Sequence, residues 1–171
     1  MIWSEFQKLI LEINLRNIQS SKTGIAKLDE SIVAHFQNEE IQLFAKAFGK
    51  PRLTEGGAFC AYYFESFMNR RPLQQLGTLL KKINPNSIAP TPNPGTELFF
   101  STGSPLAIPC EEHLALFTLI KEIKLQLALS TEINWPWIDS AMTLISSWLR
   151  MNHEKEENCL FPHLFRLLNE K

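Results

Sequence analysis

The sequence predicts an all-α fold, a four-helix bundle made of two helical hairpins with a helix and a proline-rich loop inserted between them. Three observations support this prediction. Apolar residues recur every three or four positions in four segments, no segment alternates convincingly like a β-strand, and prolines concentrate between the two hairpins. The 171 residues are enough for one hydrophobic core, so we expect a single domain over residues 1–171, with the insertion at about 52–108.

The first hairpin is predicted from two apolar stripes at helical spacing. The first helix should end near Gln19, and the polar residues 20–23 should cap the second, which Gly49 and Pro51 end. The first stripe contains Trp3, Phe6, Ile10 and Ile13, and the second contains Ile25, Leu28, Ile32, His35, Glu39 and Leu43. The second helix therefore directs two polar residues towards the core.

The insertion has a different composition. Residues 58–83 read as a helix interrupted at Pro72, and their aromatic beginning, 58–68, is suited to covering the bundle or to binding a protein partner. Six of the ten prolines lie between residues 84 and 109, which predicts a surface loop rather than regular helix. Within this loop the apolar residues 98–100 are compatible with a short extended piece.

The second hairpin follows Pro109. Its two helices are separated by the turn Asn134-Trp135-Pro136, and the fourth helix should run at least to His153. The third stripe contains His113, Leu116, Ile120, Ile123 and Leu127, and the fourth contains Ile138, Met142, Ile145 and Leu149.

Composition excludes several classes of function. Seventeen basic residues face eighteen acidic ones without a long run of either sign, so we expect neither nucleic acid nor a membrane surface as a partner. No segment has the ~20 continuous apolar residues that cross a bilayer, and residues 1–15 do not resemble a signal peptide. Three widely spaced cysteines, Cys60, Cys110 and Cys159, indicate reduced thiols and a cytoplasmic protein.

Histidine and glutamate carry the chemical signal. His35 precedes Glu39 by four residues, and His153 precedes Glu157 by four, so each pair projects from one face of a helix. His113 adds an imidazole from the third helix. Imidazole and carboxylate are donors that iron, manganese and zinc accept, and the sequence therefore predicts a metal site between the helices.

These residues lie in motifs that resemble the hemerythrin-like family. Residues 35–44 match its pattern His-Phe-x-x-Glu-Glu-x-x-Leu-Phe, residues 153–162 resemble the corresponding motif of its fourth helix, and Glu112-His113 resembles the start of its third helix. The resemblance implies a non-haem centre of two irons, with manganese or zinc as alternatives. It further implies a small diatomic ligand such as dioxygen or nitric oxide, or iron handling under stress; it does not decide whether the protein is an enzyme.

Two departures from the family pattern affect the ligand set. Leu160-Phe161-Pro162 comes one residue early, and aligning it would make Glu156 the ligand and leave Asn152 where the family has histidine. We prefer His153 with Glu157 because they share a helical face, and we expect Glu40, Glu154 and Glu156 to be solvated.

The second departure is the lack of a histidine in the first helix. Hairpin symmetry points to Glu5 as the replacement ligand, although a first-turn acid is also favoured by the helix dipole alone. The predicted metal ligands are thus His35, Glu39, His113, His153, Glu157 and Glu5.

Two alternatives remain open from the sequence. One is a single zinc or iron ion held by His35, His113 and His153 with one glutamate. The other is a bundle that has lost its metal and acts as a protein-interaction module through residues 58–109. The missing first-helix histidine and the shifted fourth-helix motif are consistent with such a loss.

Overall fold

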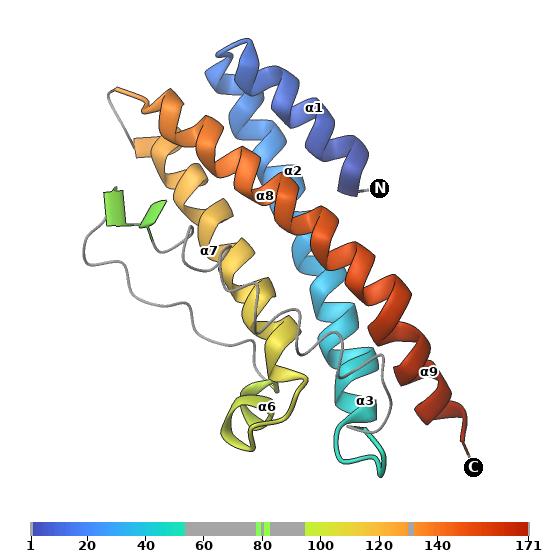
Figure 1. Ribbon diagram of the computed structural model, residues 1–171. Helices are drawn as coiled ribbons and strands as arrows, with labels where there is room; N and C mark the ends of the chain where they lie inside the picture. Colours follow the sequence, from blue (N-terminus) through green and yellow to red (C-terminus); the bar gives the residue numbers. More distant parts are fainter. Residues whose placement is uncertain (1, 54–77, 80, 83–94, 130–131, 171) are drawn as a thin grey trace.

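The computed structural model describes residues 2–53, 78–79, 81–82, 95–129 and 132–170, and these are all-helical, without a strand among them. Four long helices run side by side, with α1 packed on α2, α2 on α7 and α7 on α8 (Figure 1). Their bounds are α1 Ile2–Asn14, α2 Ile18–Gln37, α7 Ala107–Leu129 and α8 Trp135–Lys155.

Two of these helices continue through a π-helical segment into a further α-helix. After α2 come η1 (Asn38–Phe44) and α3 (Ala45–Ala47), and after α8 come η2 (Glu156–Leu160) and α9 (Phe161–Asn169). The amide of Ala45 bonds to the carbonyl of Glu40, and that of Phe161 to the carbonyl of Glu156, five residues back in both cases. Such segments occur frequently at functional sites.

Two apolar cores stabilise the arrangement. The larger one combines residues of α1, α2, α7 and α8, among them Phe6, Phe36 and Trp148, and it confirms most of the apolar residues in the predicted stripes. His35 was predicted to face the core and is exposed, and the side chain of Trp3 lies outside the described part of the structure. The smaller one joins η1 and α3 to α6 (Glu97–Ser101), the start of α7, η2 and α9, with Phe44 and Phe99 fully buried. Burying one such side chain contributes about 1.5–3 kcal/mol.

The turn of the first hairpin comes earlier than the sequence predicts. Helix α1 ends at Asn14, Arg16 adopts a left-handed φ of 54°, and α2 already begins at Ile18. The side chain of Asn17 caps α2 by accepting a hydrogen bond from the amide of Ser20, 3.1 Å away. The predicted end near Gln19 and the predicted cap at residues 20–23 are therefore wrong.

Most of the insertion lies outside the described residues, including the aromatic segment 58–68. Residues 78–79 and 81–82 are helical, and the carbonyl of Leu79 accepts a hydrogen bond from the indole of Trp137 at 3.0 Å. The extended piece predicted at residues 98–100 is wrong, because these residues belong to α6, whose Phe99 packs into the smaller core. Helix α7 begins two residues before Pro109, where the first turn tolerates proline.

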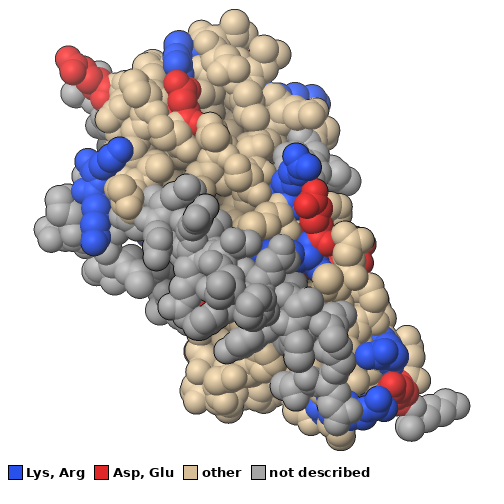
Figure 2. Space-filling view, viewed as in Figure 1, with Lys and Arg blue, Asp and Glu red and all other residues tan. Residues whose placement is uncertain are grey.

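Acidic and basic side chains are interspersed on the face shown in Figure 2, without a large patch of one sign among the described residues there. None of the helices in the described part of the chain has the length and apolar character needed to cross a bilayer.

The cap of α2 can be tested with two exposed residues. We predict that Asn17→Ala lowers the free energy of unfolding by about 1 kcal/mol, because the amide of Ser20 loses its acceptor. Thr23→Ala is the control, since the Thr23 hydroxyl only bonds back to the carbonyl of Gln19, and its effect should stay within about 0.5 kcal/mol. Urea denaturation measures both; a larger loss for Thr23→Ala would place the helix start at residues 20–23.

Candidate metal centre

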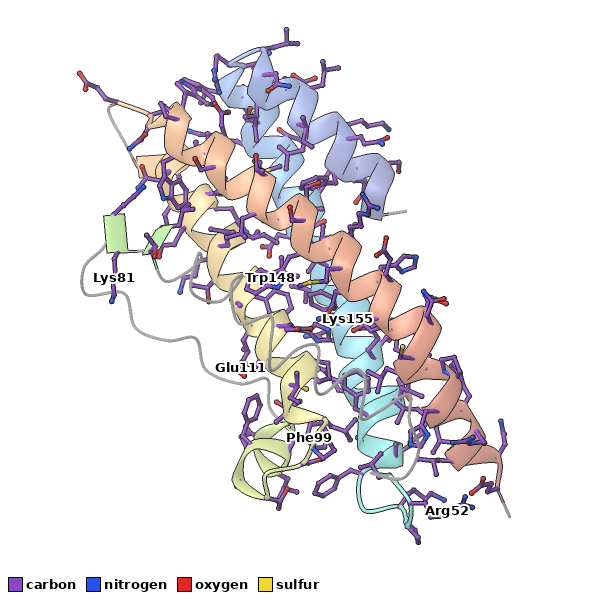
Figure 3. The ribbon with its side chains drawn as sticks, viewed as in Figure 1. Arg52, Lys81, Phe99, Glu111, Trp148 and Lys155 are labelled. Carbon is purple, nitrogen blue, oxygen red and sulfur yellow. The ribbon has the colours of Figure 1, made fainter. Side chains whose placement is uncertain are left out.

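A layer of polar side chains lies between the two apolar cores. It is formed where η1, the start of α7 and the junction of α8 with η2 meet, and Lys155 marks it next to Trp148 of the larger core (Figure 3). Each of its members is at most 7% exposed; they are Glu39, Glu40, Glu112, His113, Asn152, Lys155 and Glu156. We refer to these seven residues as the polar layer.

His113 is at the centre of the layer and has no exposed surface. Its ring stacks on Phe36, with ring centroids 3.6 Å apart, and its Nδ1 lies 2.8 Å from Glu40 Oε1. Because the carboxylate only accepts, Nδ1 is the donor, and in the neutral ring Nε2 keeps its lone pair. Nε2 faces Glu156 Oε1 at 3.4 Å and Glu39 Oε2 at 3.6 Å. A carboxylate that fixes one ring nitrogen so that the other is free to coordinate is typical of metal-binding histidines.

Glu39 lies between two imidazoles. Its Oε1 is 2.9 Å from His35 Nε2, and its Oε2 faces His113. Atoms of His35, Glu39 and Glu156 all lie within 4.8 Å of one another, the spacing of ligands around one metal ion. The His35 side chain is 44% exposed and therefore forms the outer edge of the cluster.

Unsatisfied oxygen atoms are concentrated at this cluster. Among the described residues, four buried side-chain oxygens lack a hydrogen bond of normal geometry, and three of them are the two carboxylate oxygens of Glu39 and Asn152 Oδ1. Buried polar atoms normally have a partner, so each exception needs an explanation. A cation between these oxygens and the imidazoles would satisfy them, and the donor set fits one.

The layer holds more carboxylates than lysine or arginine side chains. Lys155 pairs with Glu112 at 3.4 Å, and the carboxylates of Glu39, Glu40 and Glu156 each lie near an imidazole. Removing a carboxylate from water costs several kcal/mol unless it is compensated. Burial raises the pKa of Glu156, and for His113 the contacts with Glu156 and Glu40 outweigh burial and raise the pKa to about 9. The layer thus attracts protons or metal ions.

The structure brings His35, Glu39 and His113 together, but it corrects the contribution of the fourth helix. His153 and Glu157 are exposed, so the prediction that they face the interior is wrong. Asn152 and Glu156 occupy the interior instead, with Asn152 Nδ2 donating to Glu156 Oε1 at 3.0 Å. The expectation that Glu40 and Glu156 are solvated is likewise wrong, whereas Glu154 is exposed as expected.

The sequence contained a signal for Asn152 and Glu156. Steps along the fourth stripe alternate between four and three residues, from 138 to 142, 145 and 149, and continuing this alternation leads to 152 and 156. The Leu160-Phe161-Pro162 motif indicates the same register. The shared helical face for which we preferred His153 with Glu157 does not distinguish them from Asn152 and Glu156, which are also four residues apart.

Glu5 does not join the group formed by His35, Glu39 and Glu156. Its carboxylate accepts a hydrogen bond from Ser31, one helical turn before His35. The first hairpin turns earlier than predicted. Each residue of α1 therefore faces an earlier residue of α2 than the hairpin symmetry suggested. The structure therefore supports the reading of Glu5 as a first-turn acid.

The thiols do not contribute to the cluster as ligands. Cys110 and Cys159 are free, as predicted, and Cys60 lies outside the described residues. Burial raises the pKa of Cys110, and nearby Glu40 raises it further, so this thiol stays protonated at neutral pH. A protonated thiol is a poor metal ligand.

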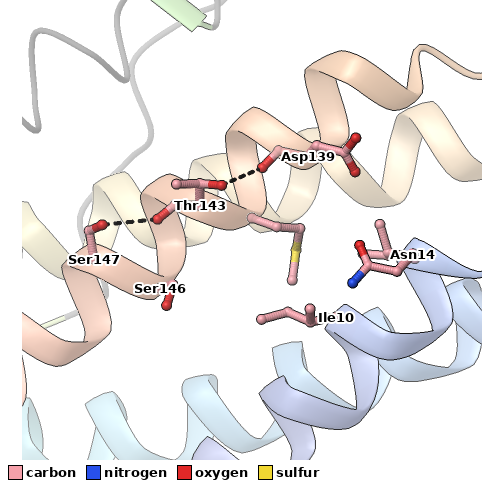
Figure 4. A pocket seen from close by; sticks show the side chains of 8 residues that line it. Ile10, Asn14, Asp139, Thr143, Ser146 and Ser147 are labelled. Carbon is pink, nitrogen blue, oxygen red and sulfur yellow. Dashed lines mark hydrogen bonds between the residues drawn. The ribbon is translucent and has the colours of Figure 1, made fainter.

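A separate pocket lies between α1 and α8 and is lined by Ile10, Asn14 and Ser146, among others (Figure 4). It shares no residue with the polar layer. The hydroxyls of Thr143 and Ser147 at its wall donate to backbone carbonyls of α8, so they serve the helix itself. Among the described residues, the close group of possible metal ligands lies in and beside the polar layer.

Known proteins give no further guidance, since no family model, curated protein or solved structure matches the chain. The resemblance to hemerythrin-like proteins depends on the motifs quoted above, and the function has to be argued from the polar layer.

The polar layer predicts a pH-dependent stability of the metal-free protein. Because the pKa of His113 rises from 6.5 to about 9 on folding, its contribution is fully present below pH 6.5 and is lost as the pH rises through 9. We expect the free energy of unfolding to fall over this range, by about 3 kcal/mol at most.

Urea denaturation with excess chelator measures this change. His113→Gln should remove most of the pH dependence and leave the part due to His35, whose pKa is raised by its contact with Glu39. His153→Ala should keep the pH dependence because that side chain is exposed. A wild-type protein equally stable at pH 6.5 and pH 9 would contradict the charge network described here.

Proposed function

We propose that this chain is a hemerythrin-like four-helix bundle with an insertion, which binds two metal ions, iron in the first place, in its polar layer. The observation that supports this most strongly is the orientation of His113. Its Nδ1 is held by Glu40, so that its Nε2 is directed at two further buried carboxylates. A histidine that only filled the core would need one partner and would not require three carboxylates around it.

The proposed ligands divide into an inner and an outer group. His113 and Glu156 form the inner group, His35 forms the outer group, and Glu39 directs one oxygen to each side. A carboxylate in this position is able to bridge two metal ions, and nitrogen with oxygen donors suits iron, manganese and zinc. Glu40 orients His113 without needing to bind a metal.

A pair of non-haem irons, when bound, supplies a reversible site for a diatomic ligand such as dioxygen or nitric oxide. The residues of this chain are suited to such a role, or to iron handling under stress, because they shield one side of the proposed site from water and leave the other side accessible. Phe36 and Phe44 cover His113 on the inner side and exclude water there. The partly exposed His35 leaves the outer side open to a small molecule.

A metal-free interaction module is the second candidate, and two observations favour it. Asn152 stands where the fourth-helix motif of the family has histidine, and a His113 that holds its proton up to a pH of about 9 compensates part of the negative charge without a metal. The partner surface would then be the insertion at residues 58–109.

Metal content distinguishes the two candidates. We predict that the purified protein, reconstituted anaerobically with iron(II), retains two ions per chain, as counted by elemental analysis. Glu156→Gln should lose most of this metal because Glu156 is buried in the cluster, whereas the neighbouring Glu157→Gln should retain it because Glu157 is exposed. Wild-type protein that binds no iron, manganese or zinc would favour the metal-free module.

Thermal unfolding provides an independent test. Metal that binds only the folded state stabilises it, by about 2.7 kcal/mol when the free ion exceeds its Kd 100-fold. Adding a chelator should therefore lower the Tm of the wild-type protein and leave the Tm of Glu156→Gln unchanged. Equal melting curves of the wild type with and without chelator, after verified metal loading, would show that the ions bind outside the folded core.

A further inference from the structure

In the side-chain amide of Asn152, the nitrogen has a hydrogen-bond partner and the oxygen has none. The residue is 3% exposed, and its Nδ2 donates to Glu156 Oε1 at 3.0 Å. Its Oδ1 is buried and has no hydrogen-bond partner. The carboxylate of Glu156 therefore explains why the NH₂ group of Asn152 is buried, but nothing comparable lies against its carbonyl oxygen.

The orientation of the amide follows from its neighbour. Glu156 Oε1 also faces His113 Nε2 at 3.4 Å and accepts in this network, so the NH₂ group of Asn152 must point at it. The carbonyl oxygen is consequently directed elsewhere in the interior. A buried carbonyl without a donor destabilises a fold unless a cation or a bound water satisfies it.

We propose that Asn152 Oδ1 is a metal ligand and that it makes this centre favour manganese(II) over zinc(II) more than a histidine in the same place would. The proposal rests on the proposed function, because it assigns a further donor to the same site. The neighbouring Glu156, which belongs to the group of close ligand atoms with His35 and Glu39, is the donor beside which this oxygen would bind.

The selectivity follows from the chemistry of the donors. Amide and carboxylate oxygens suit manganese(II), which accepts six oxygen-rich ligands, whereas imidazole suits zinc, which prefers four ligands in a tetrahedron. With Asn152, the fourth helix supplies two oxygen donors and no nitrogen. A histidine in its place would add a nitrogen and shift the preference towards zinc.

The test compares the affinities of the full chain for two metals. Manganese(II) binding is measured from the loss of the free-ion electron paramagnetic resonance signal, and zinc(II) binding by competition with a chelating dye. We expect Asn152→His to raise the zinc-to-manganese affinity ratio about tenfold or more, and Asn152→Leu to weaken manganese binding about 10- to 100-fold with a smaller effect on zinc. Asn152→Asp keeps an oxygen donor and should keep the preference for manganese.

Asn158→Leu is the matched control, because Asn158 is an exposed asparagine of the same segment whose amide bonds only to the backbone of Glu154. It should leave both affinities unchanged. An unchanged ratio in Asn152→His, with equal weakening of both metals in Asn152→Leu, would show that Asn152 only positions Glu156, and would overturn the inference while leaving the proposed function intact. Wild-type protein that binds neither manganese nor zinc would overturn the inference, and the proposed function would fail with it only if the protein also bound no iron.

Discussion

The burial of several carboxylates between two apolar cores is the constraint on which the rest of this structure depends. Glu39, Glu40 and Glu156 are removed from water at the level where η1, α7 and η2 meet, and imidazoles and an amide are among the groups that lie against them. Apolar packing above and below the layer supplies the free energy that makes this burial possible. A bundle stabilised by packing alone would place apolar residues there, and the proposed metal binding offers a reason for the polar ones.

The π-helical segments are a local consequence of the same constraint. Regular α-helical spacing separates neighbouring residues by 100°, so two consecutive side chains do not normally face the same interior point. In η1 the wider turn accompanies the burial of both Glu39 and Glu40, and in η2 it begins at Glu156. Both π-helical segments lie at the polar layer, which links this backbone irregularity to the site rather than to the cores.

The sequence predicts those parts of the fold that depend on apolar burial. The stripes of α2, α7 and α8 are correct because Ile32, Ile120 and Ile145 have no alternative environment of comparable free energy. The sequence did not predict helix ends that depend on one polar contact, such as the start of α2 at the Asn17 cap. Of the predicted ligands, His35, Glu39 and His113 lie close together, and chemistry and periodicity together pointed to them. In the fourth helix the predicted pair His153 and Glu157 is one residue away from the buried pair Asn152 and Glu156.

Protons and metal ions compete for the same atom in this layer, and that competition connects the two candidate functions. The carboxylates that would hold a cation also raise the pKa of His113 to about 9, so at pH 7 a metal has to displace a proton from Nε2. Two pH units below the pKa, this displacement lowers the apparent metal affinity about 100-fold. The metal-free charge network and the proposed metal centre would therefore be two states of one site, with their balance set by pH and by the free metal concentration. Asn152 would take part only in the metal-bound state, because its carbonyl oxygen cannot bind a proton at neutral pH.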